Sequence, residues 1–113
     1  MKINCDIGER GEHPVDLELM ELIDIANIAC GGHAGDLKTV NLFRKLAEDH
    51  GVSISAHLSY PDKENFGRKS LDISASDLKK SLSEQYSLLD DVKTVKLHGA
   101  LYNDCWLNEE LAE

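Results

Sequence analysis

The chain has 113 residues, enough for one domain or part of one, and 42% of them are hydrophobic, which allows a packed core. Its formal net charge of −9 leaves no basic stripe to meet phosphates, so we expect no nucleic-acid partner. No run approaches the ~18 consecutive apolar residues of a membrane span. Because residues 1–4 already read as a strand, we expect no signal peptide, no membrane partner and a cytoplasmic location.

The first half of the chain predicts two strand–helix pairs. A short strand is expected over residues 2–5, followed by a polar loop and a helix that starts at Pro14. Residues 24–29 are mostly apolar and rich in β-formers, as in an interior parallel strand. A glycine-broken turn then leads to Asp36, a good N-cap for a helix that Gly51 ends. The expected apolar faces are Leu17, Met20 and Ile23 in the first helix and Leu37, Val40, Phe43 and Ala47 in the second.

A third strand is predicted over residues 52–56, with His57 just beyond its end. Residues 58–71 form a long loop, of a kind that is usually functional or mobile in a compact domain. The run 74–77 resembles a capping box and predicts the start of a helix. The apolar face of that helix is expected to consist of Leu78, Leu82, Tyr86 and Leu89.

The fourth strand is expected over residues 94–97 and to end at His98-Gly99-Ala100. A turn that Tyr102 and Asn103 close should follow, and then a helix that starts at Asn108. Strands that alternate with helices imply parallel β/α units with right-handed crossovers. A barrel of eight such units typically needs about 250 residues, so four units form at most half of one. The chain is therefore part of a barrel, a small open α/β sheet, or a sheet whose exposed edges pair with another chain in a homo-oligomer.

Each predicted strand is followed by a polar side chain suited to catalysis. Asp6 follows the first strand, His33 and Asp36 the second, His57 the third and His98 the fourth. Parallel strands bring these ends to one face, which in a barrel is the mouth of the active site. Three imidazoles and two carboxylates there can perform acid–base catalysis or hold a divalent metal. Each also has a structural alternative, a hydrogen-bonded histidine or, for Asp36, a helix cap alone.

Two basic side chains are candidates for binding an anionic substrate. Lys96 projects to the side of its strand opposite its apolar neighbours, which in a barrel can mean inward. Arg68, in the long loop, could clamp a carboxylate through two hydrogen bonds. The alternative for both is a solvated surface position. Tyr102 and Asn103 follow as hydrogen-bond partners or as simple turn residues.

Four motifs, spread in order over nearly the whole chain, resemble one known family. They are Asn4-Cys5-Asp6-Ile7-Gly8-Glu9; the run from Asn27 to Asp36; Ala56-His57 with Tyr60-Pro61-Asp62 and Phe66-Gly67-Arg68; and Lys96 with His98-Gly99-Ala100-Leu101-Tyr102-Asn103. On these motifs the chain resembles the LamB/YcsF family, which provides the A subunit of ATP-dependent 5-oxoprolinases. The resemblance implies a seven-stranded β/α barrel of the glycoside hydrolase and deacetylase type. Residues 1–113 would then form its N-terminal part, with the first four units.

The same resemblance implies the opening of the 5-oxoproline lactam to glutamate, together with B and C subunits and coupled to ATP hydrolysis by the complex. The implied catalytic positions are Asp6, His33, Asp36, His57 and His98, and the implied substrate-binding positions are Asn4, Glu9, Asp62, Arg68, Lys96, Tyr102 and Asn103. The chain departs from the family pattern at Leu58, Ser59 and Leu97. We interpret these departures as changes in loop shape that leave the substrate preference open.

Two other functions remain open from the sequence. One is a metal-dependent hydrolase of the deacetylase kind, with Asp6, His33 and His98 as ligands, although the chain has no local H-x-x-x-H pair. The other is a non-catalytic module that binds a carboxylate or another protein chain, or that self-associates. The absence of half a barrel favours this last function for the chain in isolation.

Overall fold

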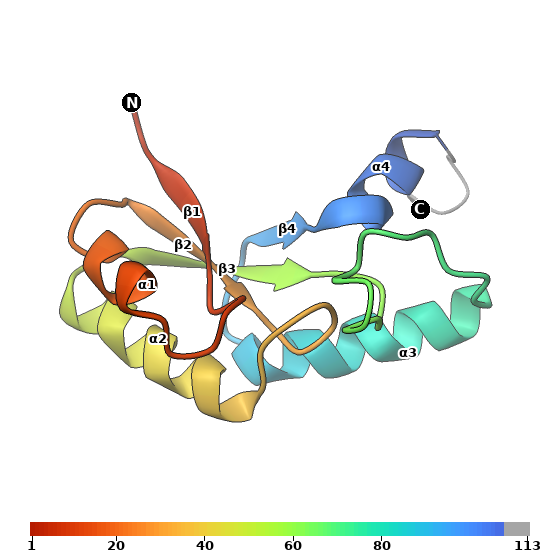
Figure 1. The fold of residues 1–113 in the computed structure, drawn as a ribbon, viewed down its shortest axis with the longest axis horizontal. Helices are drawn as coiled ribbons and strands as arrows, with labels where there is room; N and C mark the ends of the chain where they lie inside the picture. The colour runs from red at the N-terminus through yellow and green to blue at the C-terminus, as the bar shows by residue number, and fades with distance from the viewer. Residues whose placement is uncertain (108–113) are drawn as a thin grey trace.

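Strands and helices alternate along the described part of the chain (Figure 1). The computed structural model describes residues 1–107. The elements are β1 (Asn4–Ile7), α1 (Pro14–Leu19), β2 (Ile25–Ala29), α2 (Leu37–Asp49), β3 (Ser53–Leu58), α3 (Ala75–Tyr86), the 3₁₀ turn η1 (Ser87–Leu89), β4 (Val95–Leu97) and α4 (Gly99–Leu107). All four strands are parallel and lie in the order β1-β2-β3-β4. The predicted α/β fold of four β/α units is thus confirmed.

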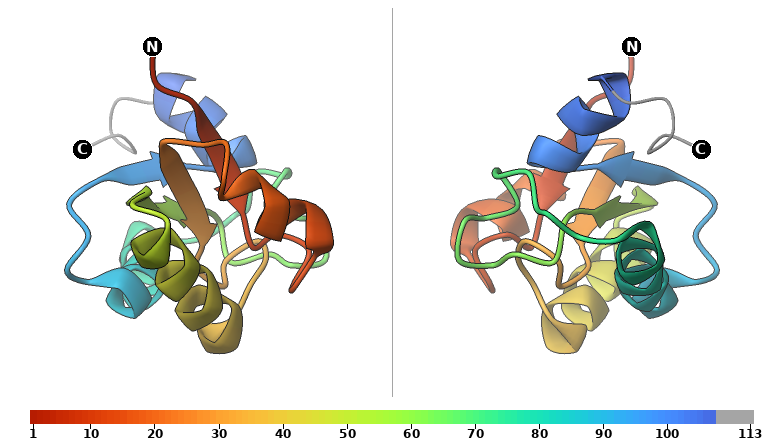
Figure 2. Two further views of the ribbon diagram at one scale, coloured as in Figure 1. Left: turned by 90° about the vertical axis from the view of Figure 1, so that its left-hand side faces the viewer. Right: turned by 90° about the vertical axis from the view of Figure 1, so that its right-hand side faces the viewer.

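One face of the sheet packs against helices and forms the main core. Ile7, Ile28 and Ala56 lie on this face and are fully buried, as are Val40 and Phe43 of α2. Figure 2 shows α2 and α3 on this same side of the sheet, away from α4. Burial of each large aliphatic or aromatic side chain stabilises the fold by about 1.5–3 kcal/mol, so this layer fixes the positions of the strands.

The opposite face of the sheet is polar, because alternate residues of a strand point to opposite sides. Asp6, Asn27 and Ser55 are neighbours in register across β1, β2 and β3. His57 and Lys96 are paired across β3 and β4 in the same way. The sequence prediction that Lys96 projects away from its apolar neighbours is confirmed by its contact with Asp6 on this polar face. The strands therefore carry the polar side chains of the candidate site on the face away from α2 and α3.

Two strand boundaries were predicted wrongly. The first strand covers Asn4–Ile7 rather than residues 2–5, because it pairs residue by residue with Ile25–Ile28. Asp6 consequently lies within the strand and not in the loop after it. The third strand extends through His57 to Leu58, because pairing with β4 continues to that point. The side chains keep their places at the carboxyl ends of the strands, and only the boundaries move.

The turn predicted after the fourth strand was also wrong, because α4 begins at Gly99. Gly99 has φ +58°, and a Cβ there would lie 2.6 Å from the carbonyl oxygen of Gly67, so only glycine fits without displacement. Tyr102 and Asn103 therefore lie on a helix rather than in a turn. The helix that we predicted from Asn108 lies outside the described residues.

The predicted helix ends are largely confirmed. Asp36 and Ser74 are N-caps, each accepting a hydrogen bond from the backbone N–H three residues later. Gly51 follows the end of α2 with φ +68°. Two apolar positions were misassigned: Leu17 and Leu37 face solvent, being 36% and 57% exposed.

Candidate functional site

Four side chains from four different segments meet beyond the carboxyl ends of the strands. They are Glu9 from the loop after β1, His33 from the turn after β2, His57 from β3 and His98 from the end of β4. Each offers one oxygen or nitrogen atom, and these four atoms all lie within 4.8 Å of one another. The predicted convergence of the three histidines is therefore confirmed. We call these four residues the histidine–glutamate cluster, and their donor atoms are of the kind that can hold a metal ion.

The shortest contacts of the cluster involve Glu9. Its Oε2 lies 2.5 Å from His33 Nε2, 3.5 Å from His98 Nδ1 and 3.7 Å from His57 Nε2. His57 Nε2 in turn lies 3.0 Å from His98 Nδ1. Burial raises the pKa of the Glu9 carboxyl, but the close contact with His33 and the nearby His57 and His98 outweigh it and hold that pKa below its usual range. Glu9 is therefore ionised at neutral pH.

The three imidazoles are packed against one another. His33 stacks on His98, with ring centroids 3.7 Å apart and planes 10° from parallel. His57 meets both rings edge-on, at 5.0 and 4.9 Å. The Phe66 ring stands edge-on to His33 and His98 at 5.1 and 5.2 Å. Because His33, His57 and His98 are at most 8% exposed, this packing leaves them little freedom to rotate.

The loop that carries Glu9 is held by a buried carboxylate. Asp16, in the first turn of α1, accepts hydrogen bonds from the backbone N–H of Gly8 and from Arg10, both at 3.1 Å. Asp16 is only 2% exposed, and Gly8 takes φ +79° beside the ring of Phe43. Burial makes these bonds hard to replace with water, so Asp16 fixes the turn on both sides of Glu9.

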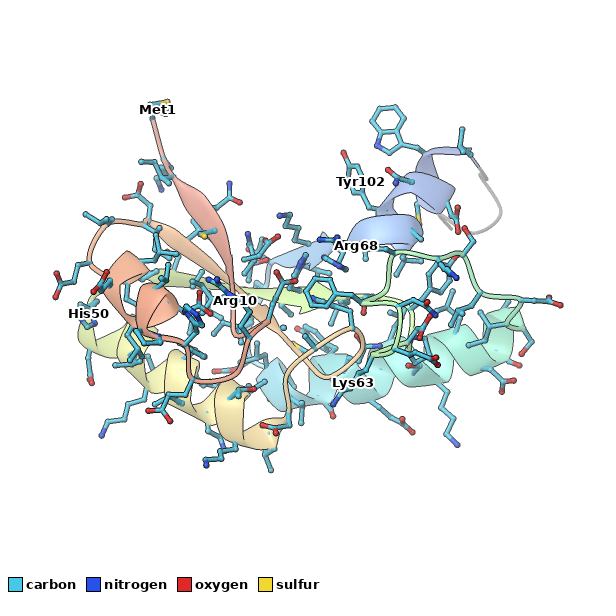
Figure 3. The ribbon with its side chains drawn as sticks, viewed as in Figure 1. Met1, Arg10, His50, Lys63, Arg68 and Tyr102 are labelled. Carbon is cyan, nitrogen blue, oxygen red and sulfur yellow. The ribbon has the colours of Figure 1, made fainter. Side chains whose placement is uncertain are left out.

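Residues 65–68 form a tight turn over the stacked histidines. Phe66 has φ +55°, which is rare for a residue with a side chain, and its carbonyl oxygen accepts a hydrogen bond from His98 Nε2 at 2.9 Å. A Cβ on Gly67 would lie 2.9 Å from His33 Cβ, so glycine is required there. Arg68, labelled in Figure 3, belongs to this turn. Its guanidinium lies 5.1 Å from the centroid of the Phe66 ring.

A second polar group, an ion pair, lies beside the cluster. Lys96 Nζ donates to Asp6 Oδ1 at 2.7 Å, and Asn27 Nδ2 donates to the same oxygen at 3.2 Å. Asp6 Oδ2 is 3.5 Å from His57 Nε2. Burial would raise the pKa of Asp6, but the nearby His57 and the hydrogen bond from Lys96 lower it far below its usual range. Asp6 therefore remains a carboxylate across the physiological range of pH.

The pKa of His98 is lowered, first by burial and then by the neighbouring His33, so its imidazole is neutral near pH 7. A hollow of about 340 Å³ opens beside it. The hollow is lined by Asp6, His57, Lys96, Leu97, His98, Gly99, Tyr102 and Asn103. The Asp6 carboxylate, the Lys96 ammonium and two imidazoles therefore face the same small hollow. The neutral side chains of Tyr102 and Asn103 add hydrogen-bonding groups to it.

The structure does not bring every predicted residue to the cluster. Asp36 is exposed, and its side chain accepts from the Thr39 backbone N–H at 2.9 Å as the cap of α2. Asp62 accepts two hydrogen bonds from Asn65 and so braces the loop over the cluster. Asn4 contacts Asn27 at 2.9 Å on the polar face of the sheet.

Other residues around the cluster were missed by sequence reasoning. Ser59 and the backbone of Phe66 hold imidazole nitrogens, Asn27 holds the carboxylate of Asp6, and Asp16 holds the loop that carries Glu9. For Asn27 a signal was available: it is a polar residue inside an otherwise apolar strand, which points to the site face of the sheet.

A parallel β/α sheet with imidazoles and carboxylates at the carboxyl ends of its strands defines a class of β/α proteins with a ligand site in that position. The LamB/YcsF family model matches residues 1–113. The chain belongs to this family.

Curated relatives and a solved structure agree with that membership. A Pseudomonas aeruginosa protein named as a 5-oxoprolinase A subunit is 44% identical, with 96% of this chain and 48% of that protein covered. The 5-oxoprolinase A subunit of Staphylococcus carnosus is 42% identical, with 89% and 44% covered. The crystal structure of a "Lactam Utilization Protein" from Thermus thermophilus superposes with a TM-score of 0.75 at 31% identity, covering 92% of this chain and 47% of that one.

The chain therefore spans about half the length of the relatives that it matches. Among the described residues, no helix is both long and apolar enough to cross a bilayer.

Proposed function

We propose that residues 1–113 form the N-terminal part of the barrel of a 5-oxoprolinase A subunit, which takes part in opening 5-oxoproline to glutamate. The likeness to relatives named as 5-oxoprolinase A subunits and as a lactam utilization protein supports this substrate. In this proposal, ATP is used by the assembled complex with its B and C subunits. A divalent metal is the further cofactor that the histidine–glutamate cluster suggests.

The observation that carries the proposal is the shared hollow. A cation, a carboxylate and two imidazoles line it, contributed by Lys96, Asp6, His57 and His98. Its volume of about 340 Å³ is at the small end of ligand sites, which are typically about 300–1,000 Å³. A small cyclic amide with a carboxylate suits both the size of the hollow and its charges.

Lactam hydrolysis requires a water oxygen to bond to the carbonyl carbon, the C–N bond to break and the nitrogen to gain a proton. An efficient general base has a pKa near the working pH, which disfavours Asp6 because its pKa is too low. The neutral imidazole of His98 is the better base, and once protonated it can pass its proton to the departing nitrogen. Asp6 then stays ionised and orients Lys96 and His57.

Lys96 is suited to bind the carboxylate of the substrate. Its ammonium has three donors, of which one is used by Asp6, and its side chain is 43% exposed. Arg68 is exposed at the rim of the loop, and among residues 1–107 it forms no ion pair, so its guanidinium is available for a second contact.

The test is ring opening by the complex of the A, B and C subunits, measured as glutamate released from 5-oxoproline. We expect His98→Ala to lower turnover by about 10²–10⁴-fold, the usual contribution of a general acid or base. His50→Ala is the matched control, because His50 is exposed and its ring bonds to the Leu46 carbonyl at the end of α2, away from the site. Full turnover in His98→Ala contradicts the assignment.

A second candidate is a metal-dependent hydrolase of the deacetylase kind. The observation that favours it is the close approach of three imidazoles and the Glu9 carboxylate. Both reactions hydrolyse an amide bond, so the substrate distinguishes them. Release of acetate from an N-acetylated sugar, with no glutamate formed from 5-oxoproline, would favour this candidate.

A further inference from the structure

The hydrogen bonds around the cluster fix which ring nitrogens carry hydrogen. His57 Nδ1 lies 3.2 Å from the carbonyl oxygen of Lys96, and His98 Nε2 lies 2.9 Å from that of Phe66. A carbonyl oxygen can only accept, so each of these nitrogens must be the donor. In a neutral imidazole the other nitrogen then has a bare lone pair, which leaves His57 Nε2 and His98 Nδ1 without hydrogen.

The same reasoning applies to His33 through a hydroxyl. His33 Nδ1 lies 3.0 Å from Ser59 Oγ, and this hydroxyl donates its single hydrogen to the carbonyl oxygen of Tyr60 at 2.9 Å. Ser59 Oγ must therefore accept from His33 Nδ1–H. His33 Nε2 is left bare, and it faces Glu9 Oε2 at 2.5 Å.

Four lone-pair-bearing atoms thus point at one another. In the neutral rings, His57 Nε2 and His98 Nδ1 would be two acceptors 3.0 Å apart, and His33 Nε2 and Glu9 Oε2 would be two acceptors at 2.5 Å. Such contacts repel unless positive charge lies between the atoms. With the imidazoles at most 8% exposed, water cannot screen the repulsion.

We propose that Glu9, His33, His57 and His98 together bind one divalent transition-metal ion, with zinc(II) as the best match. Zinc–ligand bonds of about 2.0–2.1 Å in a tetrahedron place the ligand atoms about 3.3 Å apart. Four of the six distances between these atoms are 2.5, 3.0, 3.5 and 3.7 Å, on both sides of that value, and all six are within 4.8 Å. The outward N–H bonds to carbonyl and hydroxyl oxygens are the usual way in which metal-binding histidines are oriented.

Protons are a poorer way to supply the charge. One proton in each short contact would make imidazolium ions of two of the rings, and the stacked pair His33 and His98 lie only 3.7 Å apart. One ion at the centre satisfies all four atoms at once. Three imidazole nitrogens also disfavour magnesium and calcium, which prefer oxygen ligands.

Asp6 is not among these ligands. The metal site considered from the sequence consisted of Asp6, His33 and His98, so the structure changes its carboxylate. Its Oδ1 already accepts from Lys96 and Asn27, at 2.7 and 3.2 Å. Glu9, which the family resemblance placed among substrate-binding residues, supplies the carboxylate instead. Binding the ion requires no lactam, so the inference can be tested apart from the proposed function. It replaces one role given there: with the ion bound, His98 Nδ1 would have no lone pair left to accept a proton, so His98 would be a ligand rather than the base.

The experiment is a calorimetric titration of the chelator-stripped protein with zinc chloride, together with the visible spectrum of bound cobalt(II). We expect one ion per chain and the intense absorption of four-coordinate cobalt(II). Glu9→Gln and His98→Ala should each weaken binding at least about 100-fold, and Ser59→Ala, which frees His33, about tenfold. His50→Ala should bind like the wild type. Circular dichroism identifies variants that fail to fold. If His98→Ala does not fold, Ser59→Ala still tests the site, because it keeps all four ligands.

Absence of binding by the wild type, or unchanged binding by Glu9→Gln and Ser59→Ala, would overturn the metal site. Such a result would mean that shared protons hold the cluster together. A protein that binds the ion but releases no glutamate in the assembled complex contradicts the proposed function alone. An active complex that holds no ion after chelation contradicts the metal site alone.

Discussion

Lys96 and Asp6 form a 2.7 Å ion pair across the polar face, although they lie on the two edge strands of the four-stranded sheet. In a flat sheet, strands separated by two others would be about 14 Å apart, since neighbours are about 4.8 Å apart. A lysine and an aspartate that meet at 2.7 Å therefore require the sheet to curl towards its polar face. Curvature of this kind is what closes a sheet into a barrel, and here it brings β1 and β4 to opposite sides of one site.

The Lys96–Asp6 pair makes the free energy of unfolding depend on pH in the acidic range. The pKa of Asp6 is lowered in the folded state, while an unfolded aspartate titrates near about 3.9. Its contribution is therefore fully present above about pH 4 and is lost as pH falls through the lower folded pKa. We expect Asp6→Asn to lose about 1 kcal/mol of unfolding free energy at pH 7, and the deficit to shrink towards pH 2. Urea unfolding at several pH values measures this.

Asp72→Asn is the control for that series, because Asp72 is exposed and outside the site. The expected result is a stability curve parallel to that of the wild type. A deficit in Asp6→Asn that stays constant from pH 7 to pH 2 would contradict the ion-pair account.

Gly67 and Gly51 offer a matched pair of substitutions. Both have a positive φ, +64° and +68°, so alanine is strained by a similar amount at either position. A Cβ at Gly51 meets nothing within 4 Å, whereas one at Gly67 would lie 2.9 Å from His33 Cβ. We expect Gly51→Ala to cost about 1 kcal/mol and Gly67→Ala about 2–3 kcal/mol more, through displacement of the stacked histidines.

Chemical denaturation of the two glycine variants gives these values. The near-ultraviolet or NMR signature of the site should change only in Gly67→Ala. Equal costs for the two substitutions would mean that the 65–68 turn adjusts freely and does not hold the histidines.

The strand ends were predictable, and with them the meeting of His33, His57 and His98, because parallel strands deliver their carboxyl ends to one edge. The place of Glu9 was not predictable from local pattern. It depends on Asp16, eight residues from Gly8, turning inward to hold the loop by buried hydrogen bonds. Such a contact is set by packing between β1 and α1 and leaves no periodic trace in the sequence.

The loop over the cluster was unpredictable for a related reason. Phe66 adopts a left-handed conformation that its side chain disfavours, and the hydrogen bond to His98 together with ring packing compensates for it. The start of α4 at Gly99 likewise depends on close contact with the backbone of Gly67, a residue of the long loop between β3 and α3. Local propensity therefore predicted a turn where tertiary contact begins a helix.

Tyr60 and Asp104 tie the long loop to α4, with the phenol donating to Asp104 Oδ2 at 2.5 Å. Burial and then this hydrogen bond to a carboxylate raise the pKa of Tyr60 to about 12, above its usual value near 10. The pair therefore stabilises the fold below about pH 10, and its contribution is lost as pH rises towards 12. Asp104→Asn should lower the pKa of Tyr60 and reduce unfolding free energy at pH 8 by about 1–2 kcal/mol.

Absorbance of the tyrosinate during an alkaline titration measures the change in the pKa of Tyr60. A Tyr60→Phe variant gives the signal of the two remaining tyrosines, Tyr86 and Tyr102, which is subtracted. Urea unfolding at pH 8 measures the loss of stability. An unchanged titration in Asp104→Asn would contradict this coupling.

Asp36 lies in a family motif, yet its side chain caps α2 in a reciprocal pair with Thr39. A cap can be supplied by serine, whereas acid–base chemistry needs the carboxylate. If Asp36 acts only as a cap, Asp36→Ser retains stability and turnover, and Asp36→Ala lowers the urea midpoint while turnover of the folded enzyme stays unchanged. The measurements are urea unfolding and, for the proposed function, glutamate release by the assembled complex. The opposite outcome is a fall in turnover of about 100-fold or more in Asp36→Ser with stability retained. A loss of that size is a loss of transition-state stabilisation, which a helix cap does not provide. It would show that the carboxylate of Asp36 itself reaches the substrate.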